Sequence, residues 1–177
     1  MKIGRVTLSD RASSGVYADL SGPEIERVLR EQFAEAVEFE SVLLPDEQKQ
    51  IENALKHLCR IGCALVVTTG GTGPAARDVT PEATRAVLEK ELPGFGEMMR
   101  AVSFPKVPTA ILSRATAGVR GKTLIVNLPG NPRAMAECLP PLMPAIAEAI
   151  DHLTGFRPAL KPATVKGFTR TTRALNP

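Results

Sequence analysis

The sequence predicts an α/β fold, a three-layer α/β/α sandwich built on a mainly parallel sheet. Three observations predict it. Segments rich in β-branched residues alternate with segments of helical periodicity, prolines and capping residues mark helix starts, and glycines or acids follow the strands. Parallel strands need helical crossovers, so this alternation indicates helices on both faces of the sheet. With 177 residues, of which 44% are hydrophobic, we expect one domain over 1–155, followed by an extended arm over 156–177.

Four strands are expected, at 3–9, 39–44, 64–69 and 123–128. Helices are expected to begin near Pro23 and after Asp46, with apolar residues at helical spacing: Ile25, Val28, Leu29 and Phe33 in the first, and Ile51, Ala54, Leu55 and Leu58 in the second.

The second half of the chain is less regular. A helix starting at Pro81 is expected to reach about residue 91, a short one covers 95–102, and 109–114 fits neither type of element. A last helix runs from about 131 towards 153. It contains Pro140, Pro141 and Pro144, which predict a kink or two shorter helices.

The stretch 68–84 joins a buried strand, a glycine loop, an acid and a helix start. Glycines in such a loop let the backbone approach a phosphate closely, and they are Gly70, Gly71 and Gly73. We expect Thr80 to cap a helix with Pro81 in its first position, so that the positive end of the helix dipole faces the loop. The alternative is a tight strand-to-helix turn. The spacing fits neither the Walker A loop nor the dinucleotide fingerprint.

Two acids stand beside these elements. Asp78 lies two residues before Thr80, where its carboxylate could hold a divalent cation facing the loop. Asp46 follows the second strand. Two structural alternatives stay open, because Asp46 could cap the next helix and Asp78 could form a turn. The carboxyl ends of parallel strands meet at one edge of a sheet, so one crevice could gather all these segments.

Composition excludes several classes of protein. The net charge of +3 is mild and the basic residues are dispersed up to the C-terminal arm, so we expect no nucleic acid as partner. A weak positive field favours phosphate-bearing small molecules, or it serves solubility alone. No apolar run approaches the roughly 20 residues of a membrane span, and the first residues enter a strand pattern, so we expect no membrane association and a cytoplasmic location. The 3 cysteines suggest buried thiols in a reducing compartment rather than a disulfide framework or a zinc site.

The string 68–84 resembles the signature of molybdenum cofactor biosynthesis proteins of the MogA/MoaB type, the molybdopterin adenylyltransferases. Residues 9–15, 44–47 and 127–132 resemble the other marked segments of that family, in the same order. The resemblance covers about 3–150, and residues 9–17 are closer to the MogA branch.

The resemblance implies transfer of AMP from ATP to the terminal phosphate of molybdopterin, with release of pyrophosphate and with Mg²⁺ as cofactor. It implies Asp46 and Asp78 as catalytic and metal-holding residues. The implied binding residues lie along the same crevice: Ser9, Asp10, Arg11, Gly70, Gly71, Thr72, Gly73, Asn127, Pro129, Gly130 and Asn131. The glycine loop would contact phosphate and ribose, while Asn127, Gly130 and Asn131 would contact the pterin. Asp10 could instead only fix its loop.

The resemblance further implies a homotrimer and a molybdenum insertase as partner. A competing hypothesis from another class is a scaffold that binds molybdopterin and presents it to the insertase without transferring AMP. Release of pyrophosphate separates the two hypotheses, because the scaffold produces none.

Overall fold

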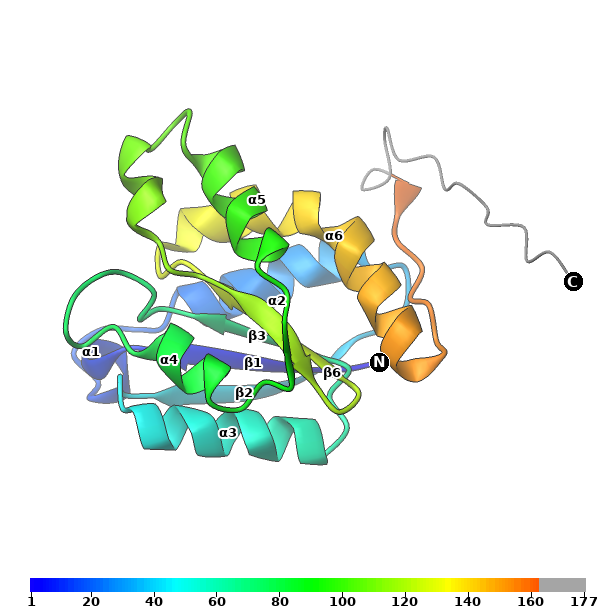
Figure 1. The fold of residues 1–177 in the computed structure, drawn as a ribbon, viewed down its shortest axis with the longest axis horizontal. Coiled ribbons are helices and arrows are strands. Elements are labelled where there is room, and N and C mark those ends of the chain that lie inside the picture. The colour runs from blue at the N-terminus through cyan, green and yellow to red at the C-terminus, as the bar shows by residue number, and fades with distance from the viewer. Residues whose placement is uncertain (163–177) are drawn as a thin grey trace, which may run out of the picture.

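The computed structural model describes residues 1–162 and confirms the three-layer α/β sandwich (Figure 1). The strands are β1 (Lys2–Leu8), β2 (Glu38–Leu44), β3 (Leu65–Thr69), β4 (Lys90–Glu91), β5 (Ala117–Arg120) and β6 (Thr123–Leu128). The helices are α1 (Asp10–Ser13), α2 (Ser21–Gln32), α3 (Gln48–Arg60), α4 (Thr80–Arg85), α5 (Gly94–Ser103), the 3₁₀ helix η1 (Pro108–Leu112) and α6 (Pro132–Thr154).

The six strands form one mixed sheet in the order β2-β1-β3-β6-β5-β4. The four predicted strands, β1, β2, β3 and β6, pair in parallel, with Val6 opposite Val42 on one side and Thr68 on the other. Strands β4 and β5 were not predicted from the sequence. They add an antiparallel edge, in which the chain turns at Gly121 so that β6 runs back along β5, and β4 pairs with β5.

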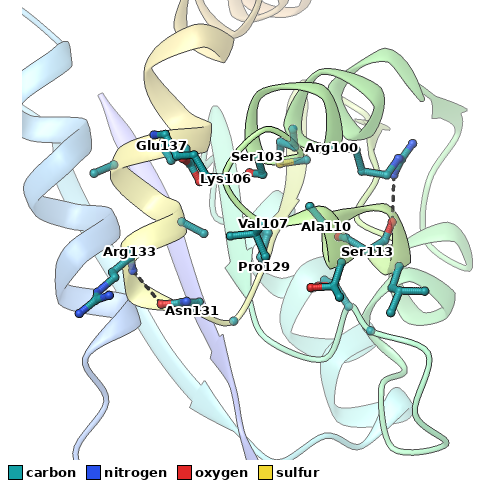
Figure 2. Close-up of a pocket in the computed structure, with 18 residues that line it drawn as sticks. Arg100, Ser103, Lys106, Val107, Ala110, Ser113, Pro129, Asn131, Arg133 and Glu137 are labelled. Carbon is teal, nitrogen blue, oxygen red and sulfur yellow. Dashed lines mark hydrogen bonds and ion pairs between the residues drawn. The ribbon is translucent and has the colours of Figure 1, made fainter.

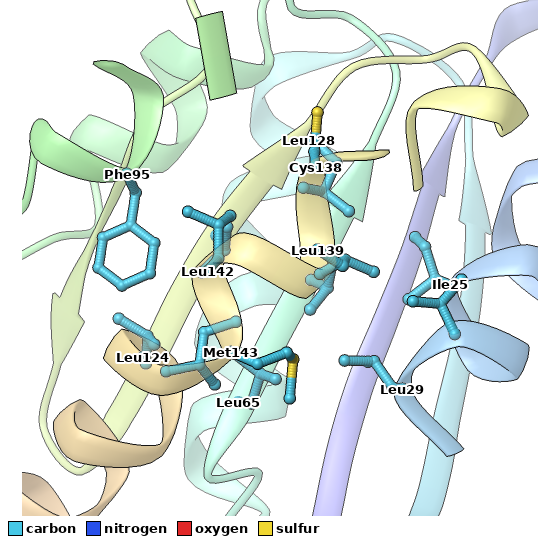
Figure 3. Close-up of a cluster of buried hydrophobic side chains, with 14 of the residues drawn as sticks. Ile25, Leu29, Leu65, Phe95, Leu124, Leu128, Cys138, Leu139, Leu142 and Met143 are labelled. Atoms are coloured by element: carbon cyan, nitrogen blue, oxygen red, sulfur yellow. The ribbon is translucent and has the colours of Figure 1, made fainter. Parts of the chain in front are cut away.

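Two hydrophobic clusters hold the layers together. Helices α2, α5 and α6 cover one face of the sheet, and α3 and α4 cover the other (Figure 1). On the first face, Leu139 and Met143 of α6 lie over the sheet beside Leu29 of α2, while Phe95 of α5 closes the far side (Figure 3). The sheet is thus apolar on both sides, which leaves its strand ends as the place for polar chemistry.

Of the two outcomes predicted for the last helix, two shorter helices is wrong, because α6 is one helix that contains Pro140, Pro141 and Pro144. The kink stays a prediction. Each interior proline costs about 3 kcal/mol or more. Burying one large apolar side chain contributes about 1.5–3 kcal/mol. Helix α6 buries a long row of them, which offsets the prolines: Met135, Leu139, Leu142, Met143, Ile146 and Ile150.

Helix α4 is shorter than predicted. It ends at Arg85 instead of near residue 91, because residues 90 and 91 pair with β5 as β4. It also begins one residue early, since Val79 and not Thr80 occupies the cap position. The hydroxyl of Thr80 donates instead to the carbonyl oxygen of Gly70, at 2.8 Å.

The described part of the predicted arm, 156–162, lies against the end of α2. The Ala34 amide donates to the Ala159 carbonyl at 2.9 Å, and the Lys161 amide donates to the Gln32 carbonyl at 2.8 Å. The rest of that prediction, 163–177, falls outside the described residues. Within residues 1–162, no helix combines the length and the apolar character that a membrane span requires.

Candidate functional site

The loops that follow the parallel strands meet at one edge of the sheet. Strand β1 lies between β2 and β3, so the chain leaves it in opposite directions, and such a switch opens a crevice at the carboxyl ends of the strands. The Ser9 amide, after β1, donates to the Leu44 carbonyl of β2 at 2.9 Å. A Cβ added to Gly130, after β6, would lie 3.3 Å from the Gly70 Cα, after β3. The expected convergence of the four loops is confirmed.

The first two glycines of the loop after β3 are required by their conformation and their surroundings. Gly70 has φ +97° and Gly71 has φ +59°, both in the left-handed region. A Cβ on Gly70 would lie 2.1 Å from the Leu8 carbonyl oxygen, and one on Gly71 would lie 2.4 Å from Thr80 Oγ1. The loop therefore packs its backbone directly against β1 and the start of α4.

The carbonyl groups of this loop are held from one side. Gly70 O accepts from Thr80 Oγ1 at 2.8 Å, Gly71 O accepts from the Thr80 amide at 3.1 Å, and Thr72 O accepts from the Arg114 amide at 2.8 Å. In a planar trans peptide, each N–H points opposite to the preceding carbonyl.

The amides of Gly71, Thr72 and Gly73 consequently point away from Thr80 and Arg114. Among residues 1–162, they donate to no backbone or side-chain acceptor. Successive free amides of this kind form a concave donor array that suits an anion, and phosphate most of all.

The two predicted catalytic acids both lie beside this loop. A Cβ on Gly71 would lie 2.8 Å from Asp46 Oδ1, and a Cβ on Gly73 would lie 2.8 Å from Asp78 Oδ2. Asp46 does not cap α3, because Glu47 holds that position and makes no side-chain cap bond. Asp78 does form a local turn, in which Oδ2 accepts from the Ala75 amide at 2.9 Å.

Asp46 and Asp10 hold each other, because the backbone amide of each donates to the carboxylate of the other. The Asp10 amide donates to Asp46 Oδ2 at 3.1 Å, and the Asp46 amide donates to Asp10 Oδ1 at 3.0 Å. Asp46 Oδ1 is buried and has no hydrogen-bond partner among the described residues. Burial raises the pKa of Asp46, and repulsion from Asp10 and Asp78 adds to that rise. A carboxylate with an unpaired oxygen and two acidic neighbours attracts a cation.

Asp10 has a counter-ion of its own, so its contacts favour the alternative in which it fixes the loop. Arg77 donates from Nε and Nη2 to the Asp10 carboxylate, at 3.1 and 2.8 Å, and from Nη1 to Glu47 at 2.9 Å. The hydrogen bond from Arg77 lowers the pKa of Asp10, and the amide of Asp46 lowers it further. Arg77 was not among the predicted site residues, although it directly precedes Asp78 in the sequence.

The two acids fit Mg²⁺ when a substrate completes the ligand set. Within residues 1–162, no group of three or more His, Cys, Asp or Glu side chains is placed to hold a metal. Mg²⁺ commonly takes one or two protein carboxylates and receives its other ligands from phosphates and waters. The unpaired oxygen of Asp46 would be one such ligand, and Asp78 lies beside the same glycine loop.

A pocket of about 750 Å³ opens beside the loop, between the start of α6 and the α5–η1 segment (Figure 2). This volume is in the range of small-molecule sites. Five predicted binding residues line it: Thr72, Gly73, Pro129, Gly130 and Asn131. The acids are not in its lining and lie next to it, beside Gly71 and Gly73.

Three basic residues of the pocket were missed by sequence reasoning. Arg100 extends from α5 along the side of the pocket and donates to the Ser113 carbonyl at 3.1 Å, while Lys106 pairs with Glu137 of α6. Arg133 stands at the start of α6, next to Asn131 (Figure 2). Arg133 directly follows the predicted segment 127–132, which was the one signal available, and no motif marks Arg100 or Lys106.

Asn127, Ser9 and Arg11, which were also predicted to bind ligand, contact other residues of the protein. Asn127 is fully buried and donates from Nδ2 to Thr68 Oγ1 at 3.0 Å and to Thr84 Oγ1 at 2.9 Å. The geometry therefore does not place the Asn127 side chain against a pterin, and it joins β3 to α4 beneath the loop instead.

Ser9 and Arg11 belong to the loop that follows β1, and both contact Tyr17. Ser9 Oγ accepts from the Ala12 amide and lies 2.9 Å from the Tyr17 hydroxyl. The Arg11 guanidinium lies 4.9 Å from the centre of the Tyr17 ring, over its face. Both residues thus stabilise the loop that follows β1.

Comparison with known proteins agrees with this geometry. The family described as "Probable molybdopterin binding domain" matches residues 4–148. Molybdopterin adenylyltransferase of Helicobacter pylori strain J99 is 54% identical over 154 residues, which cover 86% of this chain and 88% of that protein. The enzyme of the same name from Escherichia coli K12 is 50% identical over 153 residues, which cover 86% of this chain and 78% of that protein.

The crystal structure of the molybdopterin biosynthesis enzyme MoaB from Thermus thermophilus aligns with a TM-score of 0.79 and 42% identity, over 88% of this chain and 97% of that one. The chain belongs to the molybdopterin-binding family of molybdenum cofactor biosynthesis proteins.

Proposed function

We propose that this chain is a molybdopterin adenylyltransferase that transfers AMP from ATP to the terminal phosphate of molybdopterin and releases pyrophosphate. The relatives that share half or more of its sequence carry that name. The observation that carries the proposal is the row of free amides at Gly71, Thr72 and Gly73, flanked by Asp46 and Asp78. A site for joining two polyanions needs anion donors and a place for a cation together, and this loop offers both.

The chemistry requires positioning more than a strong base. A phosphate monoester has its second pKa near ~6, so the attacking phosphate is already largely ionised at neutral pH. The main barrier is repulsion between the two phosphates. The loop amides would donate to phosphate oxygens of ATP, and being fixed in advance they need no rearrangement as charge develops.

Asp46 and Asp78 are the residues that would hold Mg²⁺, whose charge would offset the repulsion between the phosphates. The raised pKa of Asp46 fits this role, since its buried carboxylate has no cationic partner of its own within hydrogen-bonding distance among the described residues. The pocket that ends at Pro129, Gly130 and Asn131 would take molybdopterin, with Arg100 and Arg133 supplying positive charge near its phosphate.

We also propose a homotrimer, a molybdenum insertase as downstream partner, and a cytoplasmic location. Exposed apolar side chains on α5, η1 and the segment between them support self-association, because soluble monomers rarely expose such a group: Met98, Phe104, Val107, Ile111 and Leu112. The thiols of Cys59, Cys63 and Cys138 are free, which supports a reducing compartment.

The direct test mixes the protein with molybdopterin, ATP and Mg²⁺ and measures pyrophosphate release. The proposal predicts release that requires both substrates, whereas the scaffold hypothesis predicts none. Asp78→Asn should keep the fold and still bind molybdopterin, yet lose most turnover with ATP. Full turnover in that variant would remove the proposed role of Asp78.

A further inference from the structure

Arg114 makes an unusual set of contacts for a residue outside the marked motifs. It follows η1, and its backbone amide donates to Thr72 O at 2.8 Å. Its guanidinium donates from Nε to Gly73 O at 2.8 Å and from Nη2 to the carbonyl oxygen of Asp78. The third nitrogen, Nη1, pairs with the Glu82 carboxylate of α4. One residue therefore holds both ends of the segment 72–78 and fastens that segment to α4.

These contacts fix the direction of the groups proposed to act on ATP. With Thr72 O turned towards the Arg114 amide, the Gly73 amide must point the opposite way across the planar peptide. With the Asp78 carbonyl held, the backbone that carries the Asp78 carboxylate is fixed as well. The planar guanidinium presents several donors in a rigid fork, and a lysine ammonium cannot reach three separate acceptors in this way.

Arg114 also joins the two halves of the site. Its neighbours Leu112 and Ser113 line the pocket proposed for molybdopterin, while its side chain holds the loop proposed for ATP. Two substrates react only when they are held in register, and a displacement of about 1 Å can cost about 100-fold in rate. Arg114 follows the pocket residues in the chain and hydrogen-bonds to the glycine loop, so it is well placed to maintain that register.

We infer that Arg114 is a positioning residue that fixes the glycine loop and Asp78 in the geometry that adenylyl transfer requires. The inference rests on the proposed function for its reaction, and on the contacts of Arg114 for its residue. Arg114 touches no reacting atom in this account. Its backbone amide orients the Gly73 amide, and its side chain, the part that a substitution changes, acts through the backbone of Gly73 and Asp78.

The experiment compares Arg114→Gln and Arg114→Lys with wild type in kcat and in KM for ATP, and measures ATP binding in the presence of Mg²⁺ by calorimetry. Both variants should lower kcat about 100-fold. Both should weaken ATP binding and raise KM for ATP about tenfold, as expected when charge-assisted hydrogen bonds that support the loop are lost. Circular dichroism at the assay temperature shows whether each variant is folded. If Arg114→Gln does not fold, the comparison uses Arg114→Lys, which is the milder change.

Arg120→Gln is the matched control. Arg120 also donates to a backbone carbonyl, Val87 O at 2.7 Å, but it lies at the opposite end of β5 from Arg114. This variant should keep the kcat and KM of wild type. A merely structural role for Arg114 would reduce the active fraction and leave KM for ATP unchanged.

The outcomes separate the inference from the proposed function. If wild type releases no pyrophosphate, the proposed function fails, and calorimetry with ATP still tests Arg114. If folded Arg114→Lys binds ATP with wild-type affinity and keeps wild-type KM and kcat, a positive charge alone suffices and the inference is overturned. Weaker ATP binding in both Arg114 variants, but not in Arg120→Gln, supports it.

Discussion

Replacing Gly71 by alanine tests whether the close packing of the glycine loop serves the proposed site. Gly71 has φ +59°, and an added Cβ would lie 2.4 Å from Thr80 Oγ1 and 2.8 Å from Asp46 Oδ1. The chain supplies a matched control in Gly121, which has φ +55° and no atom within 4 Å of an added Cβ. The two substitutions share the backbone strain, and only Gly71→Ala adds the collision.

The expected magnitudes follow from these contacts. Left-handed backbone costs a non-glycine residue about 1–2 kcal/mol, so Gly121→Ala should destabilise the protein by that amount. In Gly71→Ala, Thr80 must also move and lose its hydrogen bond to Gly70 O, which is worth about 1 kcal/mol. The free energies of unfolding of the two variants should therefore differ by at least about 1 kcal/mol, or about 2–4 °C in the midpoint of thermal unfolding for a domain of this size.

Activity should separate the two variants more strongly than stability does. Displacing Asp46 from the loop should lower kcat about 100-fold in Gly71→Ala, while Gly121→Ala keeps the wild-type rate. Denaturant unfolding and pyrophosphate release, measured on the same samples, give both numbers. Equal destabilisation of the two variants, together with full activity in Gly71→Ala, would show that the loop tolerates an added methyl group and that its close packing does not serve the site.

Three further predictions concern buried polar groups. Asp46→Asn should remove activity yet raise the midpoint of thermal unfolding at pH 7, because the raised pKa of Asp46 means that its ionised form opposes folding. Its advantage over wild type should shrink as the pH falls through that raised pKa and wild-type Asp46 becomes protonated, and an advantage independent of pH would contradict this. Asn127→Ala should lower the free energy of unfolding by about 2 kcal/mol, since it leaves the hydroxyls of Thr68 and Thr84 without that donor, and denaturant titration measures the loss. Burial raises the pKa of the Cys63 thiol to about 11, so iodoacetamide at pH 8 should label Cys63 only after unfolding, and rapid labelling of the native protein would show that this thiol is accessible.

Much of the fold was predictable because it depends on local patterns. The strands β3 and β6 are buried apolar segments, and β1 and β2 mix apolar with polar residues; the predicted bounds of all four differ from the observed ones by a residue or so. What failed depends on tertiary context. Strand β5 carries only four residues, and residues 90–91 become a strand only because β5 lies beside them. The prolines of α6 are tolerated because burial along the whole helix outweighs them, which no local rule can show.

The candidate site divides in the same way. The acids and the glycine loop were predictable because each follows a strand, and parallel strands bring such segments together. The side-chain contacts of Arg114 were not, since they join residues 32 to 41 positions apart in the chain. Asn127 stands within a recognised motif, yet its side chain is turned into the core. A sequence motif marks a backbone position, and the direction of each side chain is decided by the packing around it.

A structure of the protein with ATP and Mg²⁺ would show whether the glycine loop and the two acids bind the nucleotide together. We expect phosphate oxygens to accept hydrogen bonds from the amides of Gly71, Thr72 and Gly73, with the metal held between them and the carboxylates of Asp46 and Asp78. A nucleotide bound away from this loop, or phosphates that contact neither the amides nor a metal at these acids, would contradict it.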